Sequence, residues 1–249
     1  MIRKPVFAGL LALMFVANAG SALAADPRLP AGSSSEVFFA VPDSPLVPPK
    51  GRKIRVAFVV SNPFNLIDMA GPMQTFLQAQ LPPYGDNGAY PFETFTVADS
   101  KKPVTAYGGL QVTPNYTFDD APDADIVVVG AQSIHNKDAY LSYLRRMSVN
   151  QKVVMSVCTG VEVLAFAGLL DGKVATSHHN YIEDFSKRYP KVKFLGDKAY
   201  VRSAPLLFTA GGETSGFELA LHIVQLYFGR DVALKTARSM EYRGPAWQN

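Results

Sequence analysis

The chain has 249 residues, of which 48% are hydrophobic and 18% charged, and its formal net charge is +3. The apolar share is ample for a buried core and excludes a disordered chain. Lysines and arginines form no run longer than short pairs such as Lys101–Lys102, which argues against an extended nucleic-acid surface.

The first 24 residues have the pattern of a signal peptide. Arg3 and Lys4 precede an almost wholly apolar run at 6–16, and small residues follow at 22–24. The run is short for a transmembrane anchor, which is the weaker interpretation. We therefore expect residues 1–24 to be removed, leaving a periplasmic or secreted protein with no stable membrane anchor.

Residues 25–52 are rich in proline, serine and glycine and are expected to form an extended leader. The remaining residues, 53–249, suit one α/β domain. We expect strands at 54–60, 92–98, 125–129, 152–157, 174–177, 192–195, 199–202 and 206–210, a hairpin at 104–118, and helices at 67–81, 138–149, 159–169 and 214–228. Alternating strands and helices predict a mostly parallel sheet covered on both faces.

Cys158 is the only cysteine, and it stands where the strand pattern of 152–157 changes into a helical one. In α/β folds such a turn forms a nucleophile elbow, and the amides and dipole of the following helix stabilise an anion. We therefore expect the Cys158 thiol to ionise more readily than a free thiol. The alternative is a small buried apolar residue.

Five segments carry a family resemblance across residues 54–242. They are 64–72 (FNLIDMAGP), 156–160 (SVCTG), 168–172 (GLLDG), 175–178 (ATSH) and 209–216 (TAGGETSG). In order and spacing they resemble the ThiJ/PfpI family of class I glutamine-amidotransferase-like proteins, most closely its isonitrile hydratase branch and the sensing domain of AraC-type regulators. The resemblance implies a flavodoxin-like three-layer sandwich, a homodimer and a reactive cysteine at the elbow.

The resemblance implies roles for three residues. Cys158 would be the nucleophile, Asp68 the carboxylate facing it, and Thr159 a hydroxyl beside it. A thiolate can attack an isonitrile carbon, and a carboxylate in a partly apolar cleft can act as acid and base because its pKa is raised. The alternatives are a helix N-cap for Asp68 and an ordinary first-turn residue for Thr159.

The chain departs from the family at two places. The family's Pro-Gly-Gly, whose amides lie near the cysteine, falls on Gly130, Ala131 and Gln132. We expect these residues to line the substrate site, with a restricted backbone at Ala131 and a polar side chain at Gln132. The second departure is Glu162, which would disfavour the thiolate if it faced Cys158, although a solvated position is the alternative.

The histidines and glycines add little more. His178 matches a family position after a strand and is expected to line the site, His135 and His222 are expected to be structural, and His179 has no assigned role. Two adjacent histidines are weak evidence for zinc, so we expect no metal and no cofactor. The Gly211–Glu213 segment before the last helix is a possible anion-binding turn, though glycine pairs are common in turns.

Three functions remain open. The first is a cysteine-dependent hydratase or hydrolase acting on a small molecule, with Thr159 in place of the histidine that a protease would need. The second is a non-catalytic ligand-binding or redox-sensing protein. A glyoxalase or deglycase is a lesser alternative because such relatives use glutamate at Asp68. Transcriptional regulation is not expected of an exported protein.

Overall fold

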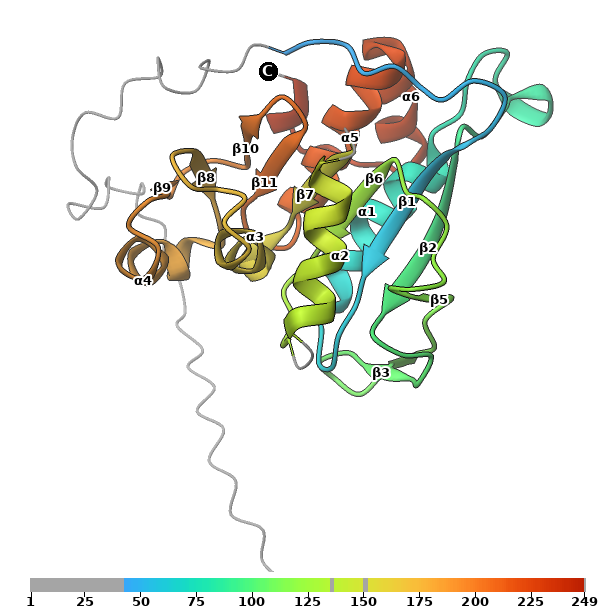
Figure 1. Ribbon diagram of the computed structural model, residues 1–249. Coiled ribbons are helices and arrows are strands. Elements are labelled where there is room, and N and C mark those ends of the chain that lie inside the picture. Colours follow the sequence, from blue (N-terminus) through green and yellow to red (C-terminus); the bar gives the residue numbers. More distant parts are fainter. Residues whose placement is uncertain (1–42, 135–136, 150–151, 249) are drawn as a thin grey trace, which may run out of the picture. The chain divides into compact units, whose positions relative to one another are not determined.

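A mostly parallel β-sheet forms the centre of the computed structural model, which describes residues 43–134, 137–149 and 152–248 (Figure 1). The expected signal peptide and its cleavage site lie outside these residues, so the division at residue 24 stays a prediction. Within the described ranges, the main sheet has seven strands in the order β10-β11-β7-β6-β1-β2-β5. Only the β10–β11 pair is antiparallel.

The strands of this sheet are β1 (Ile54–Val59), β2 (Phe92–Ala98), β5 (Tyr116–Thr117), β6 (Ile126–Val129), β7 (Val153–Ser156), β10 (Tyr200–Ala204) and β11 (Leu207–Ala210). Two small sheets accompany it, the β3 (Val104–Thr105) and β4 (Gln111–Val112) hairpin and the parallel pair β8 (Val174–Thr176) and β9 (Lys193–Leu195). The expected hairpin excursion is therefore confirmed, and its end at β5 joins the main sheet.

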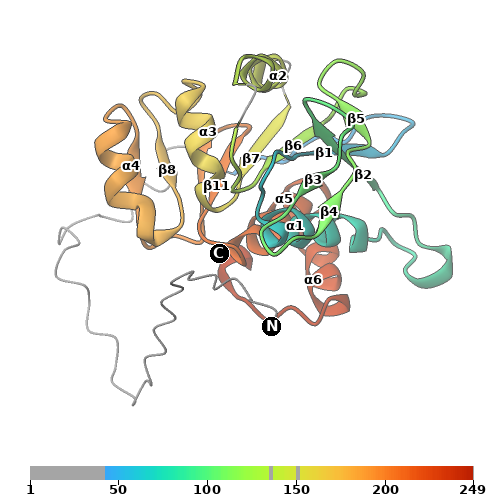
Figure 2. The ribbon, with the colours of Figure 1, turned by 90° about the horizontal axis from the view of Figure 1, so that it is seen from below.

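The α-helices are α1 (Leu66–Gln78), α2 (Lys137–Val149), α3 (Val161–Phe166), α4 (Ile182–Arg188), α5 (Ser215–Phe228) and α6 (Arg230–Ser239). Short 3-10 helices are η2 (Gly85–Asn87), η3 (Cys158–Gly160), η4 (His179–Tyr181) and η5 (Ala246–Gln248). Seen along the sheet, α2 and α3 cover one face and α1, α5 and α6 the other (Figure 2). The predicted three-layer α/β architecture is confirmed.

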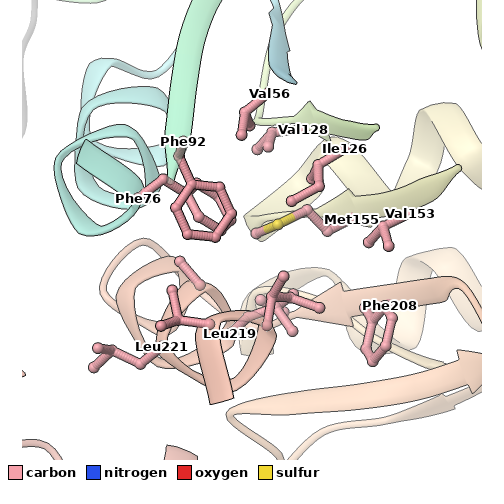
Figure 3. Packing of buried hydrophobic residues seen from close by; sticks show 14 of the residues in the cluster. Val56, Phe76, Phe92, Ile126, Val128, Val153, Met155, Phe208, Leu219 and Leu221 are labelled. Atoms are coloured by element: carbon pink, nitrogen blue, oxygen red, sulfur yellow. The ribbon is translucent and has the colours of Figure 1, made fainter. Parts of the chain in front are cut away.

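Alternate residues of the central strands supply the two cores, as expected for a sheet buried on both faces. On one face, Val56, Val128 and Met155 pack with Phe76 of α1 and Leu219 of α5 (Figure 3). On the other, the intervening residues pack with α2 and α3. The two cores hold the carboxyl ends of β1, β6 and β7 in register, which is the edge from which the site is built.

Three expectations about the elements need correction. The helix expected at 159–169 begins as the 3-10 turn η3, and α3 ends at Phe166, because Gly168 takes a left-handed φ of 77° and its N–H bonds to Ala165. Strands β8 and β9 form their own sheet instead of extending the main one. Helices α4 and α6 were not predicted.

Both ends of the described chain are tied to α5. In the leader, the Asp43 carboxylate accepts from Arg202 at 3.0 Å and lies 3.4 Å from His222 Nε2, which confirms a structural role for this histidine. The C-terminal Trp247 is 1% exposed, and its N–H donates to Glu218 of α5 at 2.7 Å. The apolar C-terminal residues thus cover their own domain. Across the described ranges, no helix combines the length and apolar character needed to cross a membrane.

Candidate active site

The turn that carries Cys158 is strained and fixed from both sides. Cys158 follows β7, opens η3, and has a φ of 59°, a left-handed value that costs free energy for a residue with a side chain. Its N–H donates to the Gly211 carbonyl at 2.8 Å, and its own carbonyl accepts from Ser177 Oγ at 3.0 Å. The predicted elbow between strand and helix is present, and two other segments hold it in place.

Gly160 allows this elbow to lie directly on the end of β6. A Cβ built at Gly160 would collide with the Val129 carbonyl oxygen and would lie 2.7 Å from that of Gly130. Since both atoms are backbone, neither can move aside cheaply. A glycine is therefore required two residues after the cysteine, and it brings Cys158 over the turn that follows β6.

Asp68 lies on the other side of that turn, in the first turn of α1. It is 0% exposed, and its Oδ2 accepts from the Ala131 N–H at 2.8 Å, while its Oδ1 has no hydrogen-bond partner among the described residues. A Cβ on Gly130 would lie 2.7 Å from the Asp68 Cβ, so Gly130 makes room for this side chain. The N-cap of α1 is Asn65, whose side chain accepts from the Ile67 N–H. The capping alternative for Asp68 is therefore wrong.

Burial sets the protonation of Asp68. Loss of solvent raises the pKa of this carboxyl to about 6, opposed by the Ala131 N–H and assisted by the negative charge of Glu213. The expected raised pKa is confirmed. At neutral pH Asp68 is a buried carboxylate with one oxygen unpaired, which is the condition of a proton acceptor.

The thiol is less acidic than the elbow alone predicts. Cys158 is 5% exposed, and burial, together with the charge of Asp68, raises its pKa to about 11, although the backbone N–H groups of Thr159 and Glu213 oppose this rise. The expected low pKa is contradicted, because two amides do not offset burial beside two carboxylates. The thiol holds its proton at neutral pH and needs a base to lose it.

The segment after β6, Gly130–Gln132, forms hydrogen bonds within the fold. The Ala131 N–H is bonded to Asp68, and the Gln132 side-chain Nε2 donates to the carbonyls of Val59 at 3.0 Å and Gly130 at 3.2 Å. Gln132 thus ties the ends of β1 and β6 together. The structure brings Gly130 and Ala131 next to Asp68, and it uses the Ala131 N–H and the Gln132 side-chain amide within the fold.

His178 is brought to the Gly211–Glu213 turn. A Cβ on Gly212 would lie 2.7 Å from the His178 ring, and His178 Nδ1 accepts from the Asn180 N–H at 3.2 Å. The ring also stacks on His179, with centroids 4.4 Å apart. In the described part of the chain, no three histidine, cysteine, aspartate or glutamate side chains are grouped to hold a metal. His135 lies outside the described residues.

Glu213 is the site residue that sequence reasoning missed. Its φ is 31°, its backbone N–H lowers the pKa of the Cys158 thiol, and its side chain is exposed. The only signal was the glycine pair before it, which suggested an anion-binding turn.

Two cavities among the described residues lie away from this site. One of about 350 Å³ is lined by Lys152, Leu206 and their neighbours at the start of β7 and β11, and another of about 950 Å³ is lined by Tyr84, Phe228 and Lys235 beside α6. Catalytic chemistry is built at the carboxyl ends of parallel strands, and neither cavity lies at that edge. The candidate site therefore lies at Cys158 and Asp68.

Residues 54–226 match the DJ-1/PfpI family. The chain is 31% identical to the isonitrile hydratase of Pseudomonas putida over 193 residues, covering 76% of this chain and 78% of the relative. It is 27% identical over 205 residues to the HTH-type transcriptional regulator GbdR of Pseudomonas aeruginosa, covering 80% of this chain. The match spans 54% of the length of that regulator.

Solved structures support the fold. A ThiJ/PfpI family protein from Pseudomonas syringae superposes with a TM-score of 0.64 at 22% identity, covering 88% of this chain and 84% of the other. Drosophila melanogaster DJ-1beta superposes with a TM-score of 0.62 at 15% identity, covering 77% of this chain and the whole of the other. At these identities the likeness concerns the backbone architecture.

The raised pKa of Asp68 predicts a stability effect. The folded state binds this proton more tightly than the unfolded chain, so the associated stability is full below the unfolded pKa and is lost as pH rises through about 6. Asp68→Asn keeps an oxygen for Ala131 and removes the titration. Its free energy of unfolding in urea, relative to the parent, should rise by up to about 3 kcal/mol between about pH 4 and pH 7.5.

The matched control is Asp86→Asn, which removes an exposed aspartate and should leave the pH dependence of the parent unchanged. A stability difference for Asp68→Asn that is the same at both pH values would contradict the burial argument.

The raised pKa of Cys158 predicts slow alkylation at neutral pH. The rate of iodoacetamide modification should have its midpoint well above the free-thiol value of about 8.5, and Asp68→Asn should move the midpoint downward by removing a nearby charge. The urea-unfolded chain, with the same single cysteine, supplies the free-thiol reference. A folded-state midpoint at or below that reference would restore the original expectation of an acidic thiol.

Proposed function

Because the chain belongs to the DJ-1/PfpI family, we propose that it is a cysteine-dependent enzyme that adds water to a small isonitrile. Cys158 is the nucleophile and Asp68 carries the proton. The observation that carries this proposal is the buried carboxylate of Asp68, with one unpaired oxygen and a pKa of about 6, acting on a thiol that holds its proton. The similarity to an isonitrile hydratase supports the choice of substrate class.

The reaction begins with proton transfer from Cys158 to Asp68 while the sulfur bonds to the isonitrile carbon. Asp68 then gives this proton to the same carbon, and a thioimidate results. Water next adds to that carbon, its oxygen forming the new bond and one of its protons going to nitrogen. The carbon–sulfur bond breaks as the hydroxyl proton returns to sulfur, and an N-substituted formamide leaves. One water is consumed and no redox change occurs.

Asp68 is suited to both transfers because its pKa lies near the working pH. The N–H groups of Thr159 and Glu213 lower the pKa of the thiol and therefore favour negative charge on the sulfur as the proton leaves. Turnover should therefore rise as pH increases through about 6, where Asp68 loses its proton and becomes a base.

A second candidate is a protein that binds a ligand at Cys158 without turnover. It is supported by the 5% exposure of Cys158, by its raised pKa and by the engagement of the Ala131 N–H with Asp68. The similarity to a transcriptional regulator is consistent with a sensing role for such a domain.

A panel of small alkyl and aryl isonitriles separates the two candidates. We expect formamide release by the parent, loss of release in Cys158→Ala, and a decrease of about 10²- to 10⁴-fold in Asp68→Asn, the range for a lost general acid or base. Thr159→Ala should retain activity if only its N–H is used. Binding of isonitriles with no formamide, and with equal affinity in Asp68→Asn, would favour the ligand-binding protein.

We also propose that the protein is exported, on the pattern of residues 1–24. Mass spectrometry of the protein recovered from a bacterial envelope fraction should give an N-terminus near Ala25. Recovery of the intact chain beginning at Met1 would contradict export with cleavage.

A further inference from the structure

Glu213 occupies a fixed position in the turn that contacts Cys158. The Cys158 N–H donates to the Gly211 carbonyl at 2.8 Å, and the Glu213 N–H lowers the pKa of the thiol. The Ser215 and Gly216 N–H groups bond back to the carbonyls of Gly212 and Glu213, at 2.9 and 3.0 Å, as the turn enters α5. The backbone of Glu213 is therefore held on both sides while its side chain remains exposed.

Two carboxylates raise the pKa of the Cys158 thiol. The two charged groups that act most strongly on the Cys158 thiol are the carboxylates of Asp68 and Glu213, and Glu213 also raises the pKa of Asp68. Asp68 is buried, so Glu213 is the exposed one of the pair. A charged molecule that reached the sulfur past this turn would pass the exposed carboxylate of Glu213.

Glu162 offers a contrast on the neighbouring helix. It lies one turn beyond Cys158 in α3, and its carboxylate forms an ion pair with Arg188 and accepts from the Tyr189 hydroxyl at 3.2 Å. Its charge is thus compensated by a cation. The sequence expectation that Glu162 is solvated and does not oppose the thiolate fits this position.

We propose that Glu213 determines the charge of the substrates that reach Cys158, admitting neutral and cationic electrophiles and disfavouring anionic ones. The inference deepens the proposed isonitrile reaction by naming its substrate class: isonitriles without a carboxylate or other anionic group near the reacting carbon. A unit charge at the distances of a site mouth changes the local concentration of a charged molecule by about three- to tenfold at low salt.

Charged thiosulfonates test the proposal without requiring turnover. Methanethiosulfonates carrying a trimethylammonium, a neutral or a sulfonate group react with thiols to form a disulfide and release methanesulfinate. Since Cys158 is the only cysteine, every adduct reports on this site. Each rate is divided by the rate of the same reagent with 2-mercaptoethanol, so that intrinsic reactivity cancels.

We expect the corrected cation-to-anion rate ratio to be about tenfold in the full chain at low salt and to fall at high salt. Glu213→Gln should lower the ratio by about three- to fivefold, and Glu213→Lys should lower it further, because one charge is removed and then reversed. Glu162→Gln is the matched control and should leave the ratio within about twofold. Circular dichroism checks that each variant is folded.

A ratio near one in the parent, or a ratio that Glu213→Gln leaves unchanged, overturns the proposal. Failure of all three reagents to modify the folded chain also overturns it, since no path then leads past Glu213 to the sulfur. A third outcome is a rate ratio that depends on Glu213 in a protein that hydrates no isonitrile. That outcome supports the charge selectivity and contradicts only the proposed reaction. Where turnover is found, ammonium- and carboxylate-bearing isonitriles should show the same order in kcat/KM.

Discussion

The loss of water around the Asp68 carboxylate is the constraint on which the site depends. A buried carboxylate is costly unless its oxygens are bonded, and here one oxygen has the Ala131 N–H and the other has no described partner. The surrounding backbone is shaped to accept it, since Gly130 gives it space and Gly160 lets the Cys158 elbow lie against the same turn. Burial thus supplies a carboxyl group that can exchange a proton near neutral pH.

Much of the fold could be predicted because the spacing of apolar residues along the sequence reflects which positions are buried. The apolar runs at β1, β6 and β7 and the strand-to-helix change at Cys158 identify a buried parallel sheet and its reactive edge. Helix α4 escaped notice because it is short and has one buried residue, Phe185. Helix α6 has a buried face of Val232, Ala233, Thr236 and Ala237, but its alanines and threonine give only a weak apolar pattern in the sequence. Helix α6 also begins immediately after Gly229, and a glycine at that position is more simply interpreted as the end of helical structure.

The residues of the candidate site could be proposed from the sequence, but the electrostatics around them could not. Cys158 and Asp68 follow from the motifs, but the pKa of a thiol depends on how many donors and charges surround it in space. The elbow suggested stabilising amides, whereas the fold adds burial and two carboxylates that outweigh them. Glu213 could not be singled out, since its importance comes from a left-handed backbone that a glutamate seldom adopts.

The single cysteine also decides how the site recovers from oxidation. A sulfenic acid formed on Cys158 has no second thiol in this chain with which to condense into a disulfide. Reduction must then come from a thiol supplied by another molecule, which has to reach a sulfur that is 5% exposed. The burial that lowers the nucleophilicity of the Cys158 thiol therefore also slows its oxidation and the reduction of its oxidised form. Rapid redox cycling of this cysteine is not favoured.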